Sequence, residues 1–522
     1  MTEFPTPAPV ANPPPQLVAT IHIGANAVSM LVAAPGEGGE ELEPVDFLEQ
    51  PVPLARDVFR AGRIGPAAME RCVRIVRSYR ETLRELGVAN AKPHRIVCTN
   101  ILAEASNQEI FLNRLHVASG LEVDALDDGE QTRLVYMKAQ RILSSDKALA
   151  RGRTLVVHVG PGNTRLLLFK AGRIESYSSY RLGSHRSHEA VQASDPHGEA
   201  WLRMLAEQSQ SVTDQILYDY GEAGAVEMVV IGHEMQSVAG RMFSGGAAAL
   251  PLKVLRQFAQ EIAGLSADER VRRLRLDYAS ADSVVAAAQI NLRLAEGLGV
   301  KRVIVPRTSF EQGLLADLPY SLSLGARFES EVVQSAVKLG RRYQIDPRHA
   351  RQVEELSLTL FDATADLHQL RSRDRLLLRV AAQLHEVGNY ISVRSHHKHS
   401  YYIIHNSEIF GLSQSDIEVV ALVARYHRHS PPKPTHEGYA ELSRDMRMRV
   451  SKLAAMLRVA DALDRAHAQR ARGLGMRVER GKFVISLPDV ADPTIERLAM
   501  ADKGDLFRHL FGLEVILESV IG

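Results

Sequence analysis

Between positions 385 and 405 the sequence concentrates side chains that can bind a metal ion. His385 and Glu386 are adjacent, and further histidines follow closely at His396, His397, His399 and His405. A neutral imidazole and a carboxylate from one helical turn can ligate a metal together. The alternative interpretation is a polar helical surface, so the choice depends on partner residues elsewhere in the chain.

Two glycine-containing turns are candidates for phosphate binding. Residues 17–34 form two β-rich runs joined by a turn of small residues, Gly24, Ala25, Asn26 and Ala27. Small side chains let a phosphate approach backbone N–H groups. Residues 153–173 repeat the pattern around Gly160, Pro161, Gly162, Asn163 and Thr164. The repeat predicts an internal duplication, in which each copy opens an α/β lobe and both turns line the cleft between the lobes.

Hydrophobic periodicity predicts the elements that position these residues. In the first lobe we expect helices over 67–86, 102–119 and 130–143, and a strand over 94–99. In the second lobe we expect strands over 227–231 and 302–305, and helices over 252–263 and 283–297. The chain then becomes helical, over 329–343, 347–368 and 373–389. Residues 473–522 predict a small α/β appendix without evident chemistry.

Composition limits the class of protein. Lys and Arg number 63 and Asp and Glu 62, so there is no bulk attraction to nucleic acid or to membrane. The two cysteines, Cys72 and Cys98, fit a reducing compartment. The Pro-rich start of the chain has no apolar signal region, and no apolar run approaches the ~18 residues that span a bilayer. We therefore expect a cytoplasmic protein with a disordered N-terminal tail.

Several motifs together resemble the exopolyphosphatase/guanosine pentaphosphate phosphatase (Ppx/GppA) family. They are the two turns and the segments TNILAEASN (99–107), DDGEQTRLVY (127–136), YRLGSHR (180–186) and RVIVPRTSFEQGLLADL (302–318). The resemblance implies an α/β fold class with two actin-like (ribonuclease H-like) lobes, followed by an all-α HD-type domain. The expected domains are a tail over 1–16, lobes over 17–145 and 146–322, the helical domain over 323–472 and the appendix over 473–522.

Both turns depart from the family pattern. Members usually begin the first turn with Asp-Ile-Gly-Ser-Asn-Ser and the second with Asp-Ile-Gly-Gly-Gly-Ser-Thr-Glu, whereas His22 and His158 replace the two Asp residues here. Mg²⁺ prefers hard oxygen ligands, so these changes weaken a phosphate-bridging Mg²⁺ site. Pro161 also removes one backbone donor. Alternatively, His22 and His158 are themselves ligands of a different metal, or tolerated replacements.

The expected general base is also absent. The position that aligns with the family's catalytic Glu holds Gln131, beside Glu130, and a substrate-binding Arg aligns with Ala103. Loss of a general base typically costs ~10²–10⁴-fold in rate, unless Glu130 substitutes for it. Phosphate binding is expected to persist through the remaining groups of the turns, namely Gly24, Ala25, Asn26, Gly160, Gly162, Asn163, Thr164 and Arg165.

The helical domain keeps a set of residues that resembles the HD phosphohydrolase motif. His349 resembles its first His, His385 and Glu386 its central pair with Glu for Asp, and Asp461 its distal Asp. His399 and His427 stand where two-metal HD domains place further imidazoles. This mixed N/O set suits Mn, Fe or Zn better than Mg. His429, His436 and His467 are expected on the surface.

The leading functional expectation is a protein that binds polyphosphate or a guanosine alarmone in the cleft between the lobes, with hydrolysis weak or lost. One alternative is a non-catalytic sensor or scaffold whose helical domain carries a metal. Another is an HD-type hydrolase that acts on a nucleotide through a metal-activated water. The resemblance also suggests a homodimer, because family members often are dimers.

Overall fold

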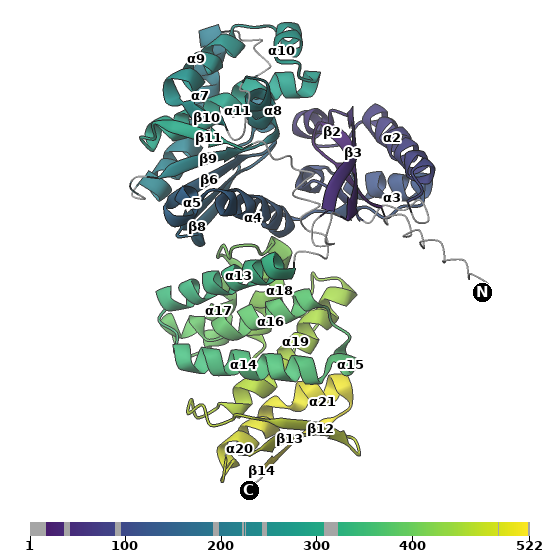
Figure 1. The fold of residues 1–522 in the computed structure, drawn as a ribbon. Coiled ribbons are helices and arrows are strands. Elements are labelled where there is room, and N and C mark those ends of the chain that lie inside the picture. The colour runs from purple at the N-terminus through teal and green to yellow at the C-terminus, as the bar shows by residue number, and fades with distance from the viewer. Residues whose placement is uncertain are drawn as a thin grey trace, which may run out of the picture. The chain divides into compact units, whose positions relative to one another are not determined.

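The computed structural model describes residues 17–35, 42–88, 95–191, 198–221, 224, 226–242, 248–306, 322–488 and 490–519. The chain divides into two compact units (Figure 1). One is built from 1–127 and 131–324, and the other from 128–130 and 325–522. The predicted tail over 1–16 and most of the motif over 302–318 lie outside the described residues. In the described part of the chain, no helix is both long and apolar enough to cross a membrane.

The first lobe is a five-stranded sheet with the order β3-β2-β1-β4-β5. Strands β1 and β2 form the predicted hairpin, and β4 and β5 run parallel to β1. Helices α2 and α3 pack together beside this sheet (Figure 1). The elements are β1 (Val18–Ile23), β2 (Ala27–Pro35), β3 (Leu42–Pro51), α1 (Leu54–Ala61), α2 (Pro66–Glu85), β4 (Arg95–Cys98), η2 (Asn100–Glu104), α3 (Gln108–Ser119) and β5 (Asp124–Ala125).

The second lobe is a six-stranded sheet with the order β10-β11-β9-β6-β7-β8, and its core includes residues of α7, α9 and α11. Helix α4, expected in the first lobe, contacts this sheet, because Tyr136 stacks on Phe169 and Gln140 donates to the carbonyl of Gly172. Asp277 begins α11, because its carboxylate accepts the N–H of Ser280. The elements are α4 (Asp128–Ser145), α5 (Lys147–Arg151), β6 (Arg153–Val159), β7 (Thr164–Lys170), β8 (Arg173–Tyr180), α6 (Ser184–Val191), α7 (Gly198–Tyr220), β9 (Glu227–Ile231), α8 (His233–Met242), β10 (Ala248–Pro251), α9 (Leu252–Ala263), α10 (Ala267–Leu274), α11 (Tyr278–Gly297) and β11 (Arg302–Val305).

The two sheets repeat one topology, as the duplicated hairpins predict. In each sheet a central strand, β1 or β6, pairs antiparallel with the strand that follows it. On its other side it pairs parallel with a later strand, β4 or β9. Both turns therefore lie at the carboxyl end of a central strand, the edge where α/β proteins bind ligands.

The second unit begins with packed helices. Asp346 starts α14 by accepting the N–H groups of Arg348 and His349, and Pro347 occupies the first turn. Ser413 starts α18 with a capping box. The elements are α13 (Leu322–Arg342), α14 (Pro347–Ala363), α15 (Ala365–His368), α16 (Ser372–Leu384), η6 (Val387–Tyr390), α17 (His396–His405), α18 (Gln414–Arg425) and α19 (Arg444–Leu463).

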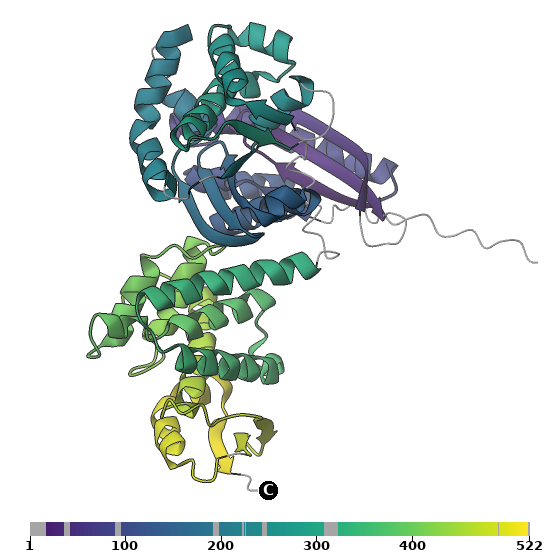
Figure 2. The same ribbon diagram turned by 60° about the vertical axis from the view of Figure 1, so that its left-hand side comes forward.

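A three-stranded sheet with the order β12-β13-β14 ends the chain, and α20 and α21 each contact both β14 and α19. This C-terminal segment is drawn in yellow in Figures 1 and 2. Its elements are β12 (Gly475–Glu479), β13 (Lys482–Leu487), α20 (Thr494–Lys503), α21 (Asp505–Phe511) and β14 (Glu514–Ser519). Three predicted helices are interrupted in the structure. The helix over 102–119 is split into η2 and α3, the helix over 347–368 is split into α14 and α15, and the helix over 373–389 ends at Leu384 before η6.

Candidate functional site

A cavity of about 120 Å³ lies in the first unit, between the two lobes. Residues of both turns, of α4 and of the start of α8 line it. From the first lobe these include His22, Gly24, Ala25, Asn26, Ala27, Ser29, Glu49 and Thr99, and from α4 onward Gln131, Leu134, Val135, Lys138, His158, Gly160, Pro161, Gly232, His233, Glu234, Gln236 and Asp277.

The two turns have the same internal geometry. Gly24 N–H donates to the carbonyl of Ala27 at 2.8 Å, and Gly160 N–H donates to the carbonyl of Asn163 at 2.9 Å. These two N–H groups therefore close the turns and are already used. The predicted phosphate cradle therefore depends on the other N–H groups of each turn.

Turn carbonyls are held by the segments that follow each hairpin. In the first turn, the carbonyls of Ala25 and Asn26 accept N–H groups of Ala55 and Val52. In the second, the carbonyl of Gly160 accepts the N–H of Ser184.

The residue after the first glycine differs between the two turns. Ala25 follows Gly24, and Pro161 follows Gly160 at the equivalent position. Ala25 has a backbone N–H, whereas proline has none. The second turn thus lacks a donor where the first has one.

His22 and His158 occupy the places where the resemblance expects Asp. His22 is buried, and His158 is half-buried, with no partner for its Nδ1 among the described residues. Burial lowers the pKa of His158 well below 6.5, and the charges of Arg165 and Lys138 lower it further. His158 is therefore neutral at pH 7 and adds no charge to attract a phosphate.

One face of α4 meets the cavity. Gln131, Leu134, Val135 and Lys138 follow a helical spacing and all line it. Gln131 thus presents a carboxamide where the family's Glu is expected. Successive residues of a helix point about 100° apart, so Glu130 does not share the direction of Gln131. Lys138 is buried and donates to Gln236 Oε1 at 2.7 Å.

Four residues predicted to bind phosphate lie outside the lining of this cavity. A Cβ on Gly162 would be 3.0 Å from Phe59 Cζ, which places Gly162 against the first lobe. Thr164 is buried, and its hydroxyl donates to the carbonyl of Leu182 at 2.6 Å. Arg165 is buried opposite His158 in the hairpin register. The fourth is Asn163, whose carbonyl closes the turn.

Two carboxylates that the sequence analysis did not single out as ligands also line the cavity. Glu234 is buried and accepts hydrogen bonds from Ser184 Oγ at 2.7 Å and Ser283 Oγ at 2.8 Å. Asp277 caps α11. Both are committed to local hydrogen bonds, and nothing in their sequence context separates them from ordinary polar residues.

The second unit brings together His349, His385 and Asp461, which we call the histidine centre. One ligand atom from each lies within 4.8 Å of the others. His349 and His385 are each 1 % exposed and Asp461 is 4 % exposed. The Nε2 atoms of both histidines have no hydrogen-bond partner in the part of the chain that the structure describes. A buried nitrogen without a partner is costly, so the centre has the donors of a cation site.

The other ring nitrogens fix which atoms face the centre. His385 Nδ1 lies 2.8 Å from the carbonyl of Ala382, so Nδ1 carries the proton and Nε2 keeps its lone pair. His349 Nδ1 lies 2.8 Å from Asp464 Oδ2, an arrangement typical of metal-binding histidines. Burial lowers the pKa of His385, which keeps the ring neutral. Asp464 was missed in the sequence, although its spacing of three from Asp461 could have indicated it.

Lys503, at the end of α20, also reaches the histidine centre. It is 7 % exposed, and its ammonium contacts Asp461 Oδ2. Burial raises the pKa of the Asp461 carboxyl, but the adjacent ammonium of Lys503 outweighs this effect and lowers the pKa overall. The donor set therefore fits a metal by its chemistry, but its carboxylate is already paired with an internal cation.

One of the two further imidazoles, His399, differs from the prediction. His427 Nε2 lies 3.1 Å from His396 Nε2, and the ring of His427 lies 5.0 Å from that of His385. His396 thus takes the position predicted for His399, whose Cβ instead faces η6 at Gly388. A Cβ on Gly388 would be 2.1 Å from the carbonyl of His396, so glycine there lets α17 approach η6.

Glu386 belongs to a second possible donor group, with His349 and His467. His467 is partly exposed, as expected of a surface residue, with 35 % of its side chain accessible. Its ring stacks on His349 with centroids 3.6 Å apart and an interplanar angle of 4°. His467 follows Asp464 in the turn that ends α19. Sequence periodicity does not reveal that this turn brings His467 onto the ring of His349.

Comparison with known proteins decides the family. Residues 31–321 match the model of the Ppx/GppA phosphatase family, and residues 333–487 match domain III of the Ppx/GppA phosphatases. The chain belongs to the Ppx/GppA phosphatase family. The resemblance inferred from the two turns and the motifs is thereby confirmed. An HD-type character of domain III stays a prediction.

Individual Ppx/GppA relatives agree with this assignment. The chain is 23 % identical over 462 residues to a guanosine-5'-triphosphate,3'-diphosphate pyrophosphatase of Aliivibrio fischeri, covering 85 % of this chain and 87 % of that protein. It is 24 % identical over 433 residues to the protein of that name from Pseudoalteromonas translucida, covering 80 % and 82 %. An exopolyphosphatase structure from Cytophaga hutchinsonii matches 58 % of this chain and 99 % of its own, with 16 % identity and a TM-score of 0.52. The two lobes thus have the actin-like fold.

Proposed function

We propose that this Ppx/GppA protein binds polyphosphate or a guanosine alarmone in the cavity between its lobes and hydrolyses it weakly or not at all. The observation that carries the proposal is the identity of three residues that line one cavity. His22, Gln131 and His158 stand where the family resemblance expects Asp, Glu and Asp. None of the three offers a carboxylate for Mg²⁺ or for a proton from water.

Anion binding is supported by the turns and by Lys138. The first turn keeps its small residues and N–H groups at the cavity, and Lys138 adds a buried positive charge to the lining. A charge in a partly dehydrated site acts more strongly on an anion than the same charge in water. The exposed Glu49 and the engaged Glu234 and Asp277 oppose binding, so we expect a moderate affinity.

Binding and turnover are tested on the same protein. Guanosine pentaphosphate and a polyphosphate of defined length are titrated calorimetrically into wild type and Lys138→Met, with release of inorganic phosphate followed in parallel. The matched control is Lys147→Met, an exposed lysine at the start of α5. We expect binding by wild type and the control, at least a tenfold loss in Lys138→Met, and little phosphate release.

Phosphate release at rates of about 1–10³ s⁻¹, which are usual for enzymes, would contradict the proposal of weak hydrolysis. Absence of binding for both ligands would contradict the proposed ligand class. The histidine centre does not favour hydrolysis, because its three residues are at most 4 % exposed, which leaves a substrate phosphate no access to them.

A further inference from the structure

We propose that the ammonium of Lys503 is the resident cation of the histidine centre and that it excludes a divalent metal from His349, His385 and Asp461. This inference concerns the second unit and goes beyond the proposed ligand of the first. It explains why a centre with the donors of a metal site also contains a buried lysine.

Burial makes the pairing of Lys503 and Asp461 obligatory. Both side chains are at least nine-tenths buried, at 8 % and 5 % exposure. An ionised group is taken out of water only when a partner of opposite charge compensates it. The Lys503 ammonium and the Asp461 carboxylate compensate each other, so neither charge requires a metal.

A second buried side chain holds Lys503 in place. Arg458 lies one turn before Asp461 on α19 and is 1 % exposed. Its guanidinium donates to the carbonyls of Lys503 at 3.0 Å and Asp502 at 3.2 Å, and to Asp505 Oδ1 at 2.7 Å. These bonds satisfy carbonyls at the carboxyl end of α20, which have no partner within the helix. They also fix the backbone of Lys503 next to Asp461.

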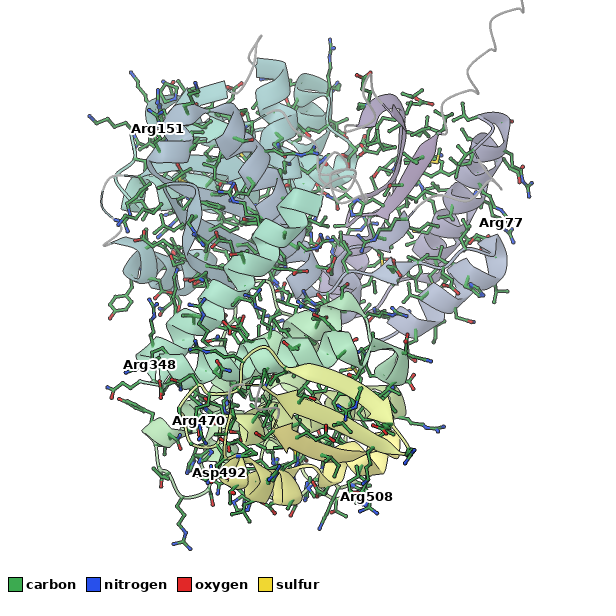
Figure 3. All side chains as sticks on the ribbon, turned by 60° about the horizontal axis from the view of Figure 1, so that its bottom comes forward. Arg77, Arg151, Arg348, Arg470, Asp492 and Arg508 are labelled. Carbon is green, nitrogen blue, oxygen red and sulfur yellow. The ribbon has the colours of Figure 1, made fainter. Side chains whose placement is uncertain are left out.

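The C-terminal segment is anchored at the other end of α20 as well. Arg470 donates to the buried Glu496, in the first turn of α20, at 2.6 Å. Figure 3 labels Arg470 near the C-terminal sheet. The appendix, in which the sequence indicated no chemistry, therefore delivers a charged side chain to the histidine centre. Lys503 lies beyond residues 333–487, which match domain III.

A metal and the ammonium compete for one carboxylate. The metal would need Asp461 together with the Nε2 atoms of His349 and His385, and His349 Nε2 already lies 3.7 Å from Asp461 Oδ1. Two positive charges a few ångströms apart in a buried site repel strongly. A divalent ion can therefore enter only when Lys503 is withdrawn or replaced.

The test compares metal uptake in full-length wild type, Lys503→Met and Lys482→Met, purified without added metal. Lys482 is an exposed lysine on β13 and serves as the matched control. Elemental analysis follows incubation with Zn²⁺ or Mn²⁺ and removal of free ion, and thermal unfolding is recorded with each metal and with EDTA. We expect about one ion per chain in Lys503→Met, as a three-ligand site allows. We expect far less than one in wild type and the control.

Metal should also raise the unfolding temperature of Lys503→Met and leave that of wild type unchanged, because only the variant has an uncompensated carboxylate. The double variant Asp461→Asn/Lys503→Met removes both charges. It should fold without metal and take up at least tenfold less metal than Lys503→Met. If Lys503→Met is poorly folded without metal, the double variant shows whether the uncompensated carboxylate of Asp461 is the cause.

Three results would overturn the proposal. Wild type that purifies with about one tightly bound ion per chain would show that Lys503 excludes nothing. Equal metal uptake by wild type and Lys503→Met would show the same. If the double variant takes up as much metal as Lys503→Met, Asp461 is not a ligand of that metal, and Lys503 and the metal do not compete for it.

Discussion

His22 and His158 hold equivalent positions in the two lobes. Each is the next-to-last residue of a central strand, β1 or β6. Each is paired antiparallel on one side, with Ser29 or Arg165, and parallel on the other, with Val97 or Ile231. Histidine therefore stands in place of the expected Asp at equivalent positions in both lobes. At His158 the replacement leaves a neutral side chain at pH 7, because the pKa of the ring is well below 6.5.

Restoring the carboxylates should restore hydrolysis. The triple variant His22→Asp/Gln131→Glu/His158→Asp places three carboxylates in the cavity lining, where they can hold Mg²⁺ and accept a proton. We expect Mg²⁺-dependent phosphate release from polyphosphate to rise at least ~10²-fold over wild type. Glu130→Gln in wild type is the control and should leave residual release unchanged, because Glu130 does not share the direction of Gln131. A large loss in that control would make Glu130 the base.

The second turn should be sensitive to a single added methyl group. A Cβ on Gly183 would lie 2.3 Å from the carbonyl oxygen of Pro161 and 2.5 Å from Gly162 Cα. Gly183→Ala must therefore displace the turn, at a cost of about 1–3 kcal/mol. We expect weaker ligand binding by calorimetry together with lower stability. Gly221→Ala is the control, since a Cβ there meets nothing within 4 Å. Unchanged binding in Gly183→Ala would mean that the second turn does not contribute to the site.

Arg458 should be among the most important residues for the stability of the second unit. Arg458→Met leaves carbonyls of Tyr426, His429, Asp502 and Lys503 without a donor. Unsatisfied buried carbonyls are expensive, so we expect a loss of roughly 3 kcal/mol or more in the free energy of unfolding.

The control for Arg458 is Arg375→Met, which breaks a partly exposed ion pair with Asp362. Such pairs contribute about 0–1 kcal/mol. Urea denaturation of both variants gives the comparison. Equal, small effects would contradict the role assigned to Arg458.

The first unit should lose stability in mild acid through His188. Neither ring nitrogen of His188 has a hydrogen-bond partner among the residues described, and burial lowers its pKa to about 3. The unfolded chain takes up a proton below about pH 6.5, whereas the folded chain does not until about pH 3. Stability should therefore fall between these values by up to about 1.4 kcal/mol per pH unit for this one group.

Trp201 makes the acid effect measurable. It is the single tryptophan of the chain, and its ring lies 5.8 Å from that of His188. Its fluorescence can follow urea denaturation at several pH values in wild type, His188→Leu and the exposed-site control His116→Leu. We expect a smaller pH dependence only in His188→Leu. The same pH dependence in all three proteins would assign the acid sensitivity to other groups.

The sequence alone determined the hairpins, the duplicated lobes and the family. These depend on short-range signals, namely alternating apolar runs, small residues in turns, and motifs that can be read directly from neighbouring positions. The replacement of the expected Asp and Glu by His22, Gln131 and His158 was visible for the same reason. Their meeting in one cavity followed from the fold that the resemblance implied.

Tertiary structure alone decided the state of the histidine centre. His349, His385 and Asp461 were expected together, but the contact of Lys503 with Asp461 joins residues that are far apart in sequence. No local pattern encodes such a contact. The choice of His396 over His399 likewise depends on how closely α17 approaches η6 at Gly388. Helical spacing allows either residue, and only packing selects between them.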